Sequence, residues 1–206
     1  MNCLPFLIPA LVLAACGAAP SAADGGRPTL LTGVKVRFPA APADSFLSLV
    51  TAQGESVYQL PVPAGATALA VNPARWAGAS ARAQELSTLL PAGMVAGSLA
   101  SGTSAGKVTL LEWLMWRDHN TNGARDAGEV LPLMSHDRVV YSTEATDVSF
   151  RSTAPEMQQR WTFKAGWSRA EHYVYLPLNS TTYQRSLSST ATERYTLHEP
   201  TPLTSQ

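Results

Sequence analysis

Short runs of β-forming residues recur along this chain, and they constrain its fold more than any other feature. Residues 34–38 alternate apolar and polar side chains, the pattern of a half-buried strand. Further candidate strands lie at 45–51, 56–60, 67–71, 138–142, 146–151, 161–165, 172–176 and 194–197. Turn residues separate these runs, as in all-β sandwiches and barrels. We therefore predict a mainly β fold, a single antiparallel β-sandwich or barrel-like domain with one short helix.

Prolines and glycines mark where these elements end. Gln53-Gly54-Glu55 is typical of a hairpin turn between the second and third strands. Pro61 should end the third strand, because proline cannot donate to a sheet ladder. The best helix candidate is 79–90, where Leu86, Leu89 and Leu90 fall near one face before Pro91.

The strongest apolar run outside the N-terminus lies at 107–116. It could be a central strand or the entering helix of an EF-hand. Gly106 precedes it and a polar segment begins at Asp118, and this short length favours a strand. Pro132 would break any helix that followed the polar segment within its first turn, so a helix–loop–helix unit is not expected.

The polar segment 118–129 matches every fixed position of a twelve-residue calcium loop, D-x-[DN]-x-[DN]-G-x5-E. Calcium takes six to eight oxygen ligands, and Gly123 would permit the tight turn that gathers them. The predicted ligands are the side chains of Asp118, Asn120, Asn122, Asp126 and Glu129 and the backbone carbonyl of Ala124. The alternative is a polar turn that only imitates such a site.

Residues 113–129 also resemble the strand-flanked calcium loops of bacterial exported and surface proteins. Their pattern is an aromatic residue followed by Asp-x-Asn-x-Asn-Gly-x-x-Asp-x-Gly-Glu. The resemblance implies a constantly bound structural Ca²⁺. Only three carboxylates are present, and Arg125 lies within the loop, so we expect weak binding with a Kd of about 10⁻⁴–10⁻³ M.

Residues 1–15 carry no charged side chain and are mostly apolar, yet they are shorter than the ~20 residues that span a bilayer. Their last three residues and the one that follows, Leu13-Ala14-Ala15-Cys16, resemble the lipobox of bacterial lipoprotein signal peptides. The resemblance implies that 1–15 are removed and that lipid on Cys16 anchors the protein to a membrane. An ordinary secretory signal or an apolar N-terminal helix are the alternatives.

The remaining chain divides by composition. Residues 16–30 are rich in Ala, Gly and Pro and should form a flexible tether. Residues 31–200 would be the β-rich domain and 201–206 a tail. Cleavage before Cys16 removes Cys3, the other cysteine, so the mature chain could form no internal disulfide.

Charge and the remaining polar groups limit the function classes. Fifteen Lys and Arg balance fifteen Asp and Glu, and without a basic run this argues against a nucleic-acid partner. Adjacent Ser135, His136 and Asp137 cannot converge as a catalytic triad, so we expect a polar turn there. The histidines show no metal-binding spacing and are expected to be solvated or ordinary sheet residues: His119, His136, His172 and His198.

The sequence therefore predicts an envelope-anchored lipoprotein facing the periplasm or exterior, without catalytic residues, that acts as a binding or interaction module. An envelope protein or a glycan is the expected partner. The alternatives are a ligand-binding lipoprotein that uses exposed aromatics and an unrecognised extracytoplasmic hydrolase. A pocket beside exposed tryptophans would favour the first alternative. Convergence of Glu112, His136 or His172 with another acid would favour the second.

Overall fold

The computed structural model describes residues 33–89, 100–101, 106–153, 156–190 and 193–200. The predicted signal peptide, Cys16, the tether 16–30 and the tail 201–206 lie outside the described residues. Within the described ranges, no helix is both long and apolar enough to cross a membrane.

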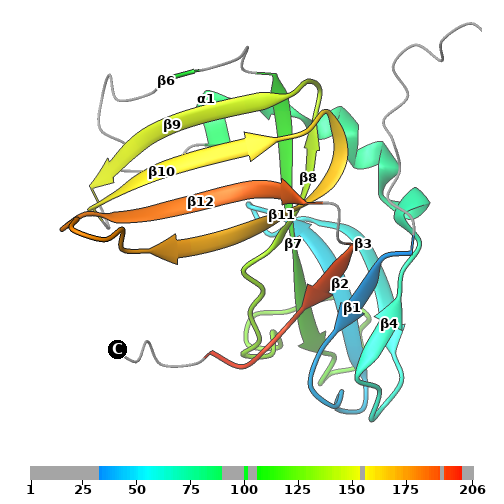
Figure 1. Ribbon diagram of the computed structural model, residues 1–206. Helices are drawn as coiled ribbons and strands as arrows, with labels where there is room; N and C mark the ends of the chain where they lie inside the picture. The colour runs from blue at the N-terminus through cyan, green and yellow to red at the C-terminus, as the bar shows by residue number, and fades with distance from the viewer. Residues whose placement is uncertain (1–32, 90–99, 102–105, 154–155, 191–192, 201–206) are drawn as a thin grey trace, which may run out of the picture.

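The protein is mainly β, and its strands form two sheets (Figure 1). The smaller sheet has the order β13-β1-β4, from β13 (Arg194–Thr196), β1 (Lys35–Arg37) and β4 (Ala68–Ala70). The larger has the order β3-β2-β7-β8-β11-β12-β10-β9-β6, with β5 beside β7. Its strands are β2 (Ser45–Thr51), β3 (Ser56–Val62), β5 (Gln84–Glu85), β6 (Ala100–Ser101), β7 (Lys107–Arg117), β8 (Arg138–Ser142), β9 (Thr146–Thr153), β10 (Glu156–Phe163), β11 (Gly166–Tyr175) and β12 (Tyr183–Thr190).

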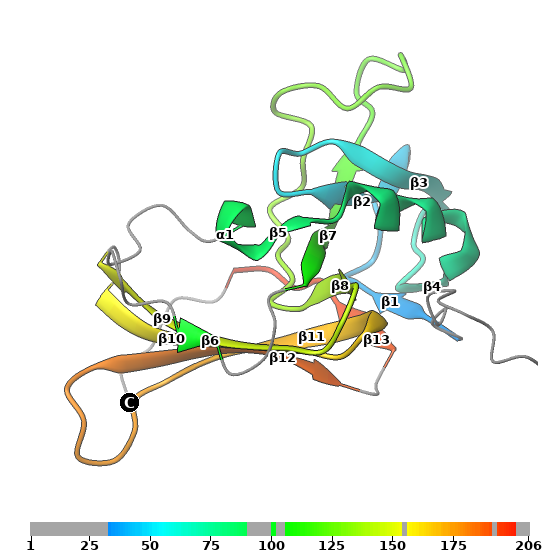
Figure 2. The ribbon, with the colours of Figure 1, turned by 90° about the horizontal axis from the view of Figure 1, so that it is seen from above.

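The larger sheet folds over so that β9, β10, β11 and β12 form one layer, with β2 and β3 in another (Figure 2). This arrangement confirms the predicted sandwich-like β class with one short α-helix, α1 (Leu86–Leu89). Most neighbouring strands are antiparallel, as expected. Two pairs are parallel, β1 with β13 and β10 with β12, and side-chain alternation carries no information on strand direction.

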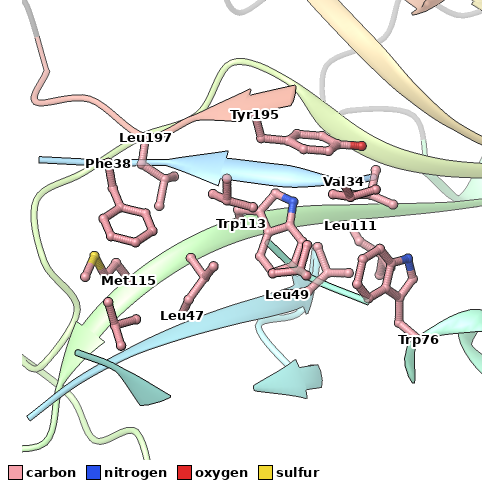
Figure 3. Close-up of a cluster of buried hydrophobic side chains, with 14 of the residues drawn as sticks. Val34, Phe38, Leu47, Leu49, Trp76, Leu111, Trp113, Met115, Tyr195 and Leu197 are labelled. Carbon is pink, nitrogen blue, oxygen red and sulfur yellow. The ribbon is translucent and has the colours of Figure 1, made fainter. Parts of the chain in front are cut away.

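Two hydrophobic clusters fill the interior, and the long strand β7 contributes to both. Leu111, Trp113 and Met115 belong to the first cluster, which lies between the two sheets (Figure 3). Val108 belongs to the second, which packs under the layer of β9 to β12. All five tryptophans are at most 7% exposed and belong to the buried interior rather than to an exposed surface: Trp76, Trp113, Trp116, Trp161 and Trp167.

The helix predicted at 79–90 is wrong over most of its length. A 3₁₀ helix occupies Ala77–Arg82, and Ala83 then adopts an extended conformation. Strand β5 follows and pairs with the first two residues of β7, Lys107 and Val108. Tertiary strand pairing therefore overrides helix propensity here. Only α1 remains helical, and Leu90 lies outside the described residues. A second 3₁₀ helix covers Pro73–Arg75.

The third strand continues through Pro61 to Val62, beyond its predicted end. Pro61 pairs with Phe46 of β2, and β3 is the terminal strand of the larger sheet. Proline is tolerated there because an edge strand leaves one row of its backbone groups unpaired.

Candidate functional site

The predicted calcium loop leaves the end of β7 and returns beside the same strand. The backbone N–H of Arg117 donates to the carbonyl of Glu129 at 2.9 Å, and that of Leu131 donates to Met115 at 2.8 Å. Trp116 and Val130 form an antiparallel bridge between these bonds. A strand and its bridging partner therefore bring the loop ends together. This agrees with the strand interpretation of 107–116.

The first and last carboxylates of the loop are buried, with Asp118 7% and Glu129 5% exposed. The two oxygens of Asp118 accept the backbone N–H groups of Asn122 at 3.2 Å and Gly123 at 2.8 Å. Those of Glu129 accept His119 and Asp126, both at 2.9 Å. Among the described residues, neither carboxylate forms an ion pair with a lysine or arginine.

The middle of the loop gathers the remaining polar ligand candidates. One oxygen of Asp126 accepts the side-chain amides of Asn120 at 2.7 Å and Asn122 at 2.8 Å. These two hydrogen bonds hold the pKa of Asp126 below its usual value. Asn122 also accepts the backbone N–H of Ala124 at 2.7 Å. Gly123, with φ at +73°, adopts the left-handed conformation that the turn requires.

The loop has the right donor chemistry for calcium, but its ligands are not grouped around one point. Carboxylate, amide and carbonyl oxygens are the ligands that calcium prefers, and all six predicted residues lie in this one turn. In the described part of the chain, however, no three His, Cys, Asp or Glu side chains are placed to hold a metal ion. Asn120 and Asn122 direct their amide nitrogens toward Asp126.

The arginine within the loop is directed away from its polar centre. The guanidinium of Arg125 donates to the carbonyl of Gly54 in the turn between β2 and β3. The backbone N–H of Asp118 donates to the carbonyl of Asp44, just before β2, at 2.9 Å. The loop is thus attached to both ends of β2.

The polar turn predicted at 135–137 is present. The backbone N–H of Asp137 donates to the hydroxyl of Ser135 at 3.3 Å, and Asp137 pairs with Arg169 at 3.2 Å. Burial, the largest effect, raises the pKa of Asp137. Glu112 pairs with Arg138 at 3.0 Å.

Three histidines that are far apart in the sequence lie together, which the sequence did not predict. The ring centroid of His136 lies 5.8 Å from that of His172 and 5.0 Å from that of His198. Burial lowers the pKa of His172 to about 4, with a further contribution from nearby arginines, so its ring is neutral at pH 7. Only the strand register could have revealed this cluster, because no short spacing connects its members.

Comparisons with known proteins found no relative of this chain. The chain matches no protein-family model, and neither curated proteins nor solved structures gave a match. Functional inference therefore depends on the residues and contacts described above.

Proposed function

We propose that this protein is an envelope-anchored lipoprotein that acts as a binding or interaction module, with one structural calcium ion in the loop 118–129. The burial of Asp118 and Glu129, without a cationic partner among the described residues, is the observation that carries the calcium part. Burying a carboxylate away from a cation is costly. A divalent ion between the two loop ends would offset both charges.

The attachments of the loop favour a structural role for the ion over a regulatory one. Its two ends are held together by the bridge between Trp116 of β7 and Val130, and its own Asp118 and Arg125 contact residues on either side of β2. An ion bound across Asp118 and Glu129 would therefore stabilise the end of the central strand. A mature chain whose single cysteine carries lipid would have no internal disulfide, and a bound calcium ion would be one stabilising element in its place.

The anchoring part of the proposal depends on the resemblance of residues 13–16 to a lipobox and on the prediction that residues 16–30 form a flexible tether. A flexible chain of about fifteen residues has an r.m.s. reach of roughly 20 Å, so the β domain would stay close to the membrane surface. We expect lipid on Cys16 to provide this attachment.

An exposed apolar surface on the hairpin of β11 and β12 supports the interaction role. This hairpin projects from the layer of β9 to β12 (Figure 2). Its large apolar side chains are about half exposed or more: Tyr173, Val174, Tyr175, Leu176, Leu178 and Tyr183. Exposed apolar side chains gathered on one hairpin are typical of contact surfaces, and an envelope protein or a glycan is the partner class that we propose.

Thermal unfolding of the protein without residues 1–16, in about 5 mM calcium or in EDTA, tests the calcium part. A Kd of about 10⁻⁴ M predicts roughly 2 kcal/mol of stabilisation, or about 4–8 °C in Tm for a chain of this size. Asp118→Asn and Glu129→Gln should abolish the shift, whereas Glu85→Gln, an exposed carboxylate on β5, should retain it. If the parent protein has the same Tm in calcium and in EDTA, the proposed calcium site is excluded.

The anchoring part needs a separate measurement. Metabolic labelling with a fatty acid should mark the full-length protein and leave Cys16→Ser unlabelled. Equal labelling of both proteins, or labelling of neither, would overturn lipidation at Cys16.

A further inference from the structure

A cavity of about 320 Å³ lies on the inner face of the layer of β9 to β12, and none of its lining residues belongs to the calcium loop. Its walls combine charged, amide and apolar side chains. The residues that matter for its chemistry are Arg138, Gln159, Trp161, His172, Arg185 and Leu187.

Strand register places these side chains on one face. Gln159 of β10 pairs with Arg185 of β12, and Trp161 pairs with Leu187 two residues further along both strands. Leu187 also pairs with His172 of β11. Paired residues on neighbouring strands project to the same side of a sheet, so three strands contribute to one continuous surface.

Two buried polar atoms on residues that line this cavity have no hydrogen-bond partner among the described residues. The side chain of Gln159 is 2% exposed, and its amide nitrogen donates to the hydroxyl of Ser152 at 2.9 Å. Its Oε1 atom accepts no hydrogen bond among the described residues, and Nε of Arg185 is likewise buried without an acceptor. Unsatisfied buried polar atoms are rare in native proteins, and each needs a physical explanation, such as a bound water or ion. Here the two atoms lie in one cavity, where a bound molecule could reach both.

The cavity also carries a positive charge that the described part of the protein does not neutralise. Arg138 pairs with Glu112 at 3.0 Å, whereas Arg185 has no carboxylate partner among the described ion pairs. His172 adds no charge at neutral pH, because burial keeps its ring unprotonated. One guanidinium is therefore available to a ligand, next to an apolar wall formed by Trp161 and Leu187.

We propose that this cavity binds a small organic acid, whose carboxylate pairs with Arg185 and whose apolar body packs against Trp161 and Leu187. A guanidinium binds a carboxylate through charge-assisted and often bidentate hydrogen bonds. The volume is at the lower end of the roughly 300–1,000 Å³ found for ligand pockets, which suits one aromatic ring with a short side chain. A hydroxyl beside the carboxylate would satisfy Oε1 of Gln159. This ligand site goes beyond the calcium and anchoring roles proposed above.

Isothermal titration of the purified protein with 3-phenyllactate and with 3-phenyllactamide tests the proposal. The two compounds share the ring and the hydroxyl and differ in that a neutral carboxamide, with an NH2 donor in place of one acceptor oxygen, replaces the carboxylate. We expect saturable binding of the acid at one site and at least tenfold weaker binding of the amide. Arg185→Gln should weaken the acid at least tenfold and leave the amide unchanged, whereas Arg75→Gln, an exposed change of the same kind, should bind both like the parent.

A second variant separates loss of the site from loss of the fold. Leu110 lines the cavity and is only partly buried, so Leu110→Trp should fill the space and prevent binding while near-ultraviolet circular dichroism stays native. The proposal is overturned if the parent shows no saturable binding of the acid or if acid and amide bind equally. Undiminished binding by Arg185→Gln would overturn it as well. None of these results depends on calcium, so the two proposals fail separately.

Discussion

The indole N–H of Trp116 donates to the hydroxyl of Ser48 at 2.9 Å, and both residues are fully buried. The indole ring also stacks on Phe46 with centroids 4.7 Å apart. Because Trp116 bridges to Val130, this bond connects β2 to the base of the predicted calcium loop.

Ser48→Ala should lower the free energy of unfolding by about 1–3 kcal/mol, because it leaves the buried indole N–H without an acceptor. Urea unfolding followed by circular dichroism measures the change. Ser56→Ala removes an exposed hydroxyl from β3 and should stay within about 0.5 kcal/mol of the parent. Similar values for the two variants would show that the bond to Trp116 contributes little.

Leu47→Ala should cost about 2–5 kcal/mol, because Leu47 is fully buried in the first hydrophobic cluster and its loss leaves a cavity. The matched change Leu178→Ala lies in the turn of the β11–β12 hairpin, where the side chain is 93% exposed, and should be nearly neutral for stability. The urea midpoints of the two variants measure these losses of stability. A large loss for Leu178→Ala would mean that the hairpin surface packs against the protein itself.

The alternating runs predicted the β class and most strand positions because burial on one face of a strand imposes a local period of two. Two strands match to the residue, β2 and β8. Strand β12 was missed because its segment is rich in serine, threonine and arginine, and its side chains are mostly half-buried. Its place in the sheet depends on partners from β10 and β11 that no local pattern reveals.

The two candidate sites also differ in how far the sequence alone could predict them. The predicted calcium loop is a continuous segment, so its turn glycine could be predicted from 118–129 and its strand flank from the adjoining residues 106–132. The cavity around Arg185 and Gln159 could not, because these residues meet only through the parallel register of β10 and β12. The histidine cluster depends equally on pairing between distant segments.

Stability should fall as the pH decreases from about 6.5 toward about 4 because of His172. The pKa of His172 is lowered to about 4 in the folded protein, so the unfolded chain takes up a proton first and gains stability relative to the native state. The contribution of neutral His172 to the free energy of unfolding is complete above pH 6.5 and is lost as the pH falls from about 6.5 toward about 4. Urea midpoints at pH 7 and pH 5 should differ less in His172→Gln than in the parent.

His119→Gln is the control for that measurement, since His119 is exposed on the loop 118–129. Its pH dependence should follow the parent. If the urea midpoint of His172→Gln changes between pH 7 and pH 5 as much as that of the parent, other groups cause the loss of stability.

Arg125 should have opposite effects on the stability of the metal-free protein and on calcium affinity. Its bond to the carbonyl of Gly54 attaches the loop to the β2–β3 turn, so Arg125→Gln should lower stability in EDTA by about 0.5–1.5 kcal/mol. The same change removes a positive charge near the proposed ion. The repulsion between this charge and the ion costs roughly 0.5 kcal/mol in a water-like dielectric, so its removal should lower the Kd for calcium about twofold. Calcium titration and unfolding in EDTA measure the two effects independently, with Arg75→Gln as the exposed control. A higher Kd in Arg125→Gln would show that the bond to Gly54 orders the loop for the ion and outweighs the charge repulsion.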